Sequence, residues 1–338
     1  MDGSLYTPQT RAYTPGMADT SGGPESRAVY AQSINRVLEY IDNHLSEPLG
    51  LDVLAGVAAF SKYHFHRMFR ASLGETLADY VSRVRLQKAA YLLLIAPARR
   101  VTDIALECGF SGSAPFAKKF RAHFGMTASA WREAKRNPEA VRRAEPSASR
   151  GRGRIHEFRV TYETGIPTWT VSTDQAERTV RVEVIPEMTL AYVRYTGPYK
   201  GDSPLFVRLF EKLFAWLGPR NLVSPRTSRT IVIYHEYPDI TPEEQLRLSV
   251  CCTVPKDTVG EGDVGVMRFS PGPFAVSRFE CGAEDYQAAW DWMYDAWLPI
   301  SGYMPADAPA FERYAFDAHN SETGKTTVDI CLPVAPRS

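Results

Sequence analysis

The chain has 338 residues, of which 44% are hydrophobic and 23% charged, and its formal net charge is zero. This composition is typical of a globular protein, and the length predicts two or three domains. No apolar run approaches the roughly 18 residues of a membrane-spanning helix, and the N-terminus lacks a secretory signal, so we exclude a membrane protein and expect a cytoplasmic one. Five cysteines without metal-ligand spacing predict reduced, mostly buried thiols and no metal site.

Charge is distributed unevenly along the chain. Residues 27–155 carry 21 basic and 11 acidic side chains, a net charge of +10, whereas residues 156–338 carry 17 and 25, a net charge of −8. The basic first half favours a polyanionic partner, and the acidic second half excludes nucleic-acid binding along the whole chain.

Composition and periodicity divide the chain into four segments. Residues 1–24 are rich in Thr, Ser, Pro and Gly and predict a disordered tail, while residues 25–137 show helical periodicity. Residues 138–155 are rich in Pro, Gly, Ser and Arg and predict a flexible basic linker. From 156 to 338, strand-like runs alternate with helical ones. The predicted fold class is therefore multidomain, with an N-terminal all-α domain of two helix-turn-helix units and a C-terminal α+β domain.

The helical segment contains an internal repeat. The stretch LAGVAAFS (residues 54–61) recurs 50 residues later as IALECGFS (residues 104–111). Each unit predicts a short helix, a tight turn and a second helix, and residues 77–94 predict a connecting helix about 27 Å long. If the connecting helix holds the second helix of each unit in place, these two helices could enter successive major grooves of one DNA duplex.

The second helix of each unit carries polar side chains that alternate with a buried face. Ser61 is a plausible N-cap, after which Phe65, Met68 and Phe69 are expected to face the core. Gly109 suits the left-handed turn of the second unit, and Ala59 stands at the matching turn of the first. The candidate DNA-contacting residues are Lys62, Tyr63, His66, Arg67 and Arg70 in the first unit and Ser111, Ser113, Lys118 and Lys119 in the second. His64 and His66 diverge on a helix, so surface histidines are the preferred interpretation over a metal site.

These motifs resemble the AraC/XylS family of transcription regulators. The residues that carry the resemblance include Leu54-Ala55, Ser61, Phe65, Gly109-Phe110, Phe116, Phe120 and Trp131. The resemblance implies a DNA-binding domain in which Tyr63, His66 and Arg67 read the first groove. The chain departs from the family at Ala59 and at the small residues 112–114, so we expect direct readout mainly from the first unit and phosphate contacts from the second.

A carboxylate interrupts an aromatic row near the C-terminus. In APAFERYAF (residues 308–316), strand alternation places Ala310, Glu312, Tyr314 and Phe316 on one face. An internal register of 80 residues matches Glu312 to Val232, so only one of two similar strands carries a charge. A buried charge without a partner costs several kcal/mol, so the position predicts a partner for Glu312.

The second half resembles the GyrI-like ligand-binding domain over about residues 180–334. The resemblance rests on LAYVRYTGPY (190–199), PAFERY (309–314) and VDICLPV (328–334). It implies a duplicated β-α-β-β module that binds hydrophobic, often cationic small molecules around an acidic residue, at the position of Glu312. Aromatic rings around a carboxylate suit such cations. The candidate ligand-binding residues are Glu312, Tyr314, Tyr234, Tyr199, Trp216, Trp290 and Tyr294.

Several alternatives stay open at this point. Glu312 could pair with Arg194 or Arg278 or face water, and the aromatic residues could be core. A GyrI-like hydrolase could use Glu312 as general base with Tyr314 as its orienter, and a protein-binding scaffold is a third reading.

We favour a transcription regulator that is not an enzyme and uses no cofactor. Its expected partners are double-stranded promoter DNA and a hydrophobic or cationic effector, with RNA polymerase as a further candidate partner.

Overall fold

The computed structural model describes residues 24–136, 155–163, 166–173, 177–224, 226–238 and 240–337, with a few side chains, Tyr63 and those of residues 316–317 among them, left aside. The predicted tail and linker lie outside this set except at Pro24 and Ile155. No described helix combines the length and apolar character needed to cross a membrane. All five cysteines are buried and unbridged, as predicted.

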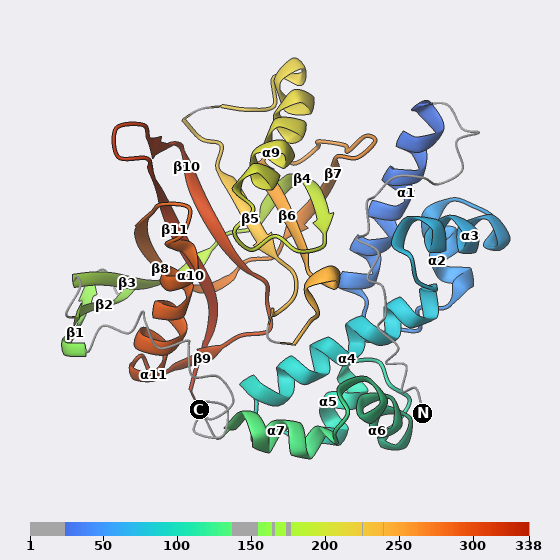
Figure 1. The fold of residues 1–338 in the computed structure, drawn as a ribbon, viewed down its shortest axis with the longest axis horizontal. Coiled ribbons are helices and arrows are strands. Elements are labelled where there is room, and N and C mark those ends of the chain that lie inside the picture. The colour runs from blue at the N-terminus through green and yellow to red at the C-terminus, as the bar shows by residue number, and fades with distance from the viewer. Residues whose placement is uncertain are drawn as a thin grey trace, which may run out of the picture.

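The N-terminal half consists of helices, in the arrangement that the repeat predicts. A long helix, α4, connects a first pair of helices to a second, and Figure 1 shows α2 and α3 near one end of α4 and α5 to α7 below it. The helices are α1 (Pro24–Asn43), α2 (Leu51–Ala58), α3 (Lys62–Leu73), α4 (Leu77–Ile95), α5 (Val101–Glu107), α6 (Ser113–Phe124) and α7 (Ala128–Arg136).

Caps and turns fix where the paired helices begin and end. The Ser61 hydroxyl accepts a hydrogen bond from the His64 amide, which caps α3 as predicted. Gly109 has φ +81°, and a Cβ there would lie 2.6 Å from the Leu45 carbonyl oxygen, so only glycine fits. The matching residue of the first unit, Ala59, adopts the same left-handed region with φ +58°.

The C-terminal half is built on one antiparallel sheet. Among the described residues its strand order is β1-β2-β3-β8-β11-β10-β5-β6-β4-β7, and β9 pairs with β11. The strands are β1 (Ile155–Glu163), β2 (Ile166–Thr173), β3 (Glu177–Ile185), β4 (Met188–Thr196), β5 (Thr230–Tyr234), β6 (Arg247–Thr253), β7 (Gly265–Phe269), β8 (Gly272–Cys281), β9 (Tyr303–Pro305), β10 (Ala310–Asn320) and β11 (Lys325–Pro336).

Two helical segments cover one face of this sheet. Helix α9 (Ser203–Leu217) packs on β4 to β6, and α10 (Tyr286–Asp291) continues through a π-helical stretch, η3 (Trp292–Trp297), into α11 (Leu298–Ile300) over β8 and β11. Short 3₁₀ turns occupy η1 (Gly218–Arg220) and η2 (Glu243–Gln245). On the opposite face the sheet curls, so that the ring of Phe269 from β7 lies 5.2 Å from that of Phe311 in β10.

Strands β5 and β10 are the central pair of the eight strands from β3 to β7 in this order, and they pair about an approximate two-fold axis. Their register sets Val232 directly opposite Glu312, Tyr234 opposite Ala310 and Tyr314 opposite Thr230. Of the residues that the 80-residue register relates, Val232 and Glu312 are direct cross-strand neighbours, so the axis passes beside Glu312. The duplicated β-α-β-β module that the sequence predicted is confirmed.

Ala59 provides a test of the turn geometry. An L-residue in the left-handed region costs about 1–2 kcal/mol, and the greater freedom of glycine in the unfolded chain offsets part of any relief. We expect Ala59→Gly to raise the free energy of unfolding of the N-terminal half by about 0.5–1 kcal/mol, measured by thermal unfolding with circular dichroism. The neighbouring Ala58→Gly is the control, because Ala58 is buried within α2 and its replacement should destabilise. A loss of stability in Ala59→Gly would contradict the strain at this turn.

Candidate DNA-binding surface, effector site and domain interface

Helix α3 presents a basic face to solvent. Phe65 and Phe69 are fully buried on its inner side. The outer side exposes Lys62, His66, Arg67 and Arg70, as predicted, and the Lys62 ammonium pairs with the carboxylate of Asp52. The side chain of Tyr63 lies outside the described set. A face of this kind offers hydrogen-bond donors both to base edges and to phosphates.

Helix α6 repeats this arrangement with shorter side chains at its start. Phe116 and Phe120 are buried, whereas Ser111, Ser113, Lys118 and Lys119 are exposed. The Lys119 ammonium donates to the Ser82 hydroxyl at 3.1 Å, which ties this helix to α4. Roles in DNA contact for the residues of either helix remain predictions.

Glu312 is buried and is satisfied by neutral donors. Its residue is 2% exposed, and its carboxylate accepts hydrogen bonds from the Tyr314 hydroxyl at 2.6 Å, the Trp290 indole at 2.8 Å and the Tyr234 hydroxyl at 2.9 Å. Within the described part of the chain, no lysine or arginine forms an ion pair with it. Burial raises the pKa of Glu312 above its ordinary value of 4.5, and the three hydrogen bonds act in the opposite direction.

The two-fold relation explains why two tyrosines meet at one carboxylate. Tyr234 and Tyr314 occupy matching positions on β5 and β10, and each stands two residues along its strand from the axis. Because alternate residues share a face, both hydroxyls reach the side chain at the centre. A symmetric scaffold thus holds a single asymmetric charge.

Further aromatic rings surround this carboxylate. The Trp290 ring stands edge-on to Tyr234 at 6.0 Å and stacks on Tyr294 at 6.3 Å, and Tyr199 lies 5.5 Å from Tyr234. Five of the predicted aromatic residues are therefore gathered around Glu312. Trp216 instead packs beneath the Arg220 guanidinium at the end of α9, so its part in this site stays a prediction. The site also includes Tyr286, whose pKa is raised by burial and by the nearby Glu312 charge, among other groups.

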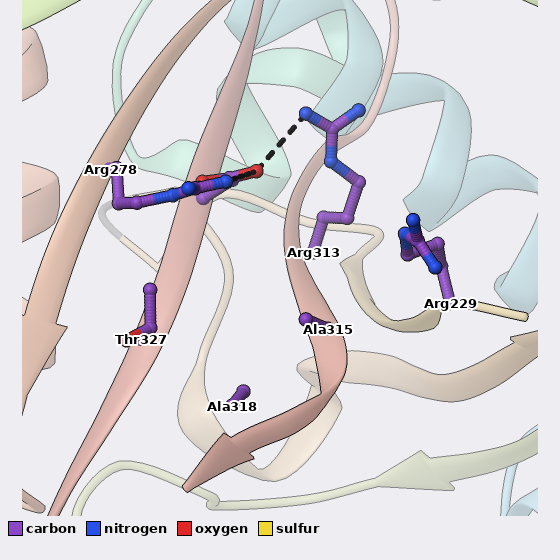
Figure 2. Close-up of a pocket in the computed structure, with 7 residues that line it drawn as sticks. Arg229, Arg278, Arg313, Ala315, Ala318 and Thr327 are labelled. Carbon is purple, nitrogen blue, oxygen red and sulfur yellow. Dashed lines mark hydrogen bonds and ion pairs between the residues drawn. The ribbon is translucent and has the colours of Figure 1, made fainter. Parts of the chain in front are cut away.

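The alternative partners of Glu312 are engaged elsewhere. Arg278 pairs with Asp329 at 2.8 Å, and Arg313 donates to the same carboxylate at 3.1 Å. Together with Arg229, these side chains line a cavity of about 240 Å³, and Figure 2 shows the arginines around it. Arg313 follows Glu312 directly in β10, so this cavity opens on the other face of the sheet. The hypothesis that Glu312 pairs with Arg278 is wrong, and its burial also excludes a water-facing glutamate.

Arg194, the other alternative partner, belongs to an ion-pair cluster between the two halves. Its guanidinium lies 3.5 Å from the carboxylate of Glu39 and 3.6 Å from that of Asp42, both in α1. Nearby, Arg247 is 4% exposed and contacts the carboxylates of Asp42, at 3.1 Å, and Glu236. This interface was not predicted from the sequence. Its only signal was an arginine at the start of the apolar strand RLSVCCT.

Comparison with known proteins agrees with this architecture. Residues 54–134 match a helix-turn-helix domain model, and residues 178–335 match a GyrI-like small molecule binding domain. The chain is 36% identical to the regulatory protein SoxS of Salmonella typhimurium over 103 residues, which cover 30% of this chain and 95% of SoxS. The chain belongs to the AraC-type transcription regulators.

Other relatives match one half of this AraC-type regulator each. A DNA gyrase inhibitor of Erwinia billingiae is 29% identical over 161 residues, covering 46% of this chain and 98% of the inhibitor. The right origin-binding protein of Escherichia coli is 36% identical over 106 residues, covering 31% of this chain and 35% of that protein. The regulator thus joins an AraC-type DNA-binding region to a GyrI-like small-molecule-binding domain, and Glu312 and its three donors lie in the latter.

The exposed faces of α3 and α6 are expected to contribute differently to DNA binding. If Arg67 contacts a base, Arg67→Ala should weaken binding to a selected duplex by about 1–3 kcal/mol with less effect on unrelated DNA. Lys118→Ala should weaken binding to all duplexes alike. It should also reduce the slope of log affinity against log salt concentration, here called the salt slope, by about the amount that one phosphate contact contributes. Fluorescence anisotropy titrations over a range of salt concentrations measure both quantities.

Arg159 is the control for these variants, because it is an exposed arginine in β1 of the acidic half. Arg159→Ala should leave both the affinity and the salt slope unchanged. If Arg67→Ala lowered the affinity for selected and unrelated duplexes equally, Arg67 would not be a residue that reads a base.

Proposed function

We propose that this regulator senses a hydrophobic cation through Glu312 and adjusts its action at a promoter accordingly. The observation that carries the proposal is the buried carboxylate with three neutral donors and no cationic side chain paired to it among the described residues. Hydrogen bonds from hydroxyl and indole groups solvate a carboxylate but leave its charge uncompensated. A cationic ligand would supply the compensating charge.

The aromatic residues favour an organic cation over a metal ion. Tyr234, Tyr314, Trp290 and Tyr294 offer ring faces and edges beside the carboxylate, and each well-placed ring contributes about 0.5–2 kcal/mol to a cation. Among the described residues, no cluster of His, Cys, Asp and Glu side chains is placed to hold a metal. The ligand class we propose is therefore a lipophilic ammonium, phosphonium or similar ion.

The carboxylate itself is the first test of this proposal. Tetraphenylphosphonium serves as a probe cation, and its binding can be followed by quenching of tryptophan fluorescence and by calorimetry. We expect Glu312→Gln to weaken probe binding tenfold or more, which corresponds to about 1.4 kcal/mol. The amide preserves the size of the side chain and removes its charge.

Two controls accompany this variant. Glu280→Gln makes the same chemical change at an exposed position of β8 and should leave affinity unchanged. Triphenylphosphine oxide, a neutral molecule with similar rings, should bind wild type and Glu312→Gln alike. Equal affinity of the cation for wild type and Glu312→Gln would refute the proposal. Consumption of a ligand that stops in Glu312→Gln would instead favour a hydrolase.

Cation binding should depend on pH through Glu312. Because burial raises the pKa of the free carboxyl above 4.5 and a bound cation favours the ionised form, the pKa should fall on binding. Affinity should therefore rise with pH until the free-state pKa is passed and then level off, with proton release on binding at lower pH. Calorimetry in buffers of different ionisation enthalpy measures this release. A flat profile in wild type would contradict it, and Glu312→Gln should show one.

A further inference from the structure

The segment that follows Tyr234 connects the Glu312 site to the DNA-binding half. The coupling segment, our name for residues 235–238 and 240–241, begins next to the tyrosine that donates to Glu312 at 2.9 Å. Its second residue, Glu236, is 8% exposed and accepts hydrogen bonds from the backbone amide of Arg247, at 2.7 Å, and from the Arg247 guanidinium. The segment therefore connects the candidate ligand site directly to the buried ion-pair cluster around Arg247.

Arg247 extends this connection to two helices of the N-terminal half. Its guanidinium donates to both carboxylate oxygens of Asp42 in α1 at 3.1 Å and to the Tyr80 hydroxyl in α4 at 2.9 Å. Breaking one partner of a buried pair leaves the other charge without compensation, so the cluster opposes small displacements. Glu236 therefore holds the side chain that docks α1 and α4.

The middle of the coupling segment makes a second, aromatic contact with α4. Tyr237 stacks on Tyr91 with ring centres 4.0 Å apart and planes 18° apart. Tyr294, which stacks on Trp290, lies near enough to affect the pKa of Tyr237, but the Tyr237 hydroxyl has no hydrogen-bond partner among the described residues. Because Trp290 donates to Glu312, these aromatic rings extend from the same carboxylate towards the same helix.

The end of the segment is part of the core of the second helix-turn-helix unit. Ile240 is 8% exposed and belongs to the apolar cluster that contains Ala90, Ile104 and Phe116. Among the described residues of the segment, Tyr237 contacts α4 and Ile240 packs in the second unit, while Glu236 reaches α1 through Arg247.

We infer that the coupling segment transmits occupancy of the Glu312 site to the DNA-binding half. The inference rests on the proposed function, because it takes Glu312 as the site that a cation fills. A cation would compete with Tyr234 and Trp290 for the carboxylate, and both donors lie at the start of a contact series to α4. Packed interfaces change between discrete arrangements more readily than they deform, so a change at Tyr234 would alter docking of the halves.

Two tyrosines of the site provide a matched, ligand-free test. Tyr234→Phe and Tyr314→Phe each remove one hydroxyl donor from Glu312, but only Tyr234 adjoins the coupling segment. We expect amide hydrogen exchange around Asp42 in α1 and Tyr91 in α4 to become roughly threefold faster or more in full-length Tyr234→Phe and to stay unchanged in Tyr314→Phe. No change in either variant, or the same change in both, would overturn the inference.

A second arm uses the probe cation and DNA. In Tyr237→Leu, which keeps an apolar side chain but removes the stack on Tyr91, tetraphenylphosphonium should quench tryptophan fluorescence as in wild type. The shift that it causes in duplex affinity should be lost. An equal shift in wild type and Tyr237→Leu would overturn the coupling role. Failure of the probe to bind wild type would remove the proposed function alone, because the exchange experiment decides the inference without a ligand.

Discussion

The packing of the two halves against each other depends on the contacts that the Arg247 guanidinium makes. This guanidinium is almost fully buried, and it finds Glu236 on its own domain and Asp42 and Tyr80 on the other. A buried ion pair stabilises a fold little compared with an apolar contact of the same size. It does, however, require particular groups at a particular distance. Such a contact specifies one docking geometry. Three further contacts between the halves are compatible with that geometry. They are the stack of Tyr91 on Tyr237, the ion pair of Lys88 with Asp307, and the hydrogen bond from the Gln32 amide to the Gly260 carbonyl.

The buried charge of Glu312 is stabilised in a different way from that of Arg247. Arg247 is compensated by carboxylates, whereas the donors that reach Glu312 from the described residues are neutral tyrosine and tryptophan groups. The first arrangement is complete in the free protein and therefore suits a structural role. The second keeps the carboxylate hydrogen-bonded but gives it no cationic partner among the described residues. The contrast between a satisfied charge and an uncompensated one, within one domain, is the main physical reason to propose that Glu312 binds a ligand.

Local patterns allowed much of this to be predicted from the sequence. The 50-residue repeat and the alternation of Phe65 and Phe69 with basic residues predict the helix pairs because the relevant contacts lie within a few turns of helix. The 80-residue register predicts Tyr234 and Tyr314 beside Glu312, since matched strands pair at the axis. The interface around Arg247 could not be predicted, because Asp42 is 205 residues away in sequence and belongs to neither repeat. The curl of the sheet that brings Phe269 to Phe311 likewise depends on long-range packing.

The pairing of Val232 with Glu312 has a consequence for how a duplicated module can evolve a binding site. Any residue placed at this point in both copies meets its own counterpart across the strand, so two acids would face each other at the closest possible separation. Mutual repulsion of the two acids would then work against the fold itself. Divergence of the copies is thus a requirement of the chemistry: one half supplies the anion, and the other supplies the valine that makes room for it.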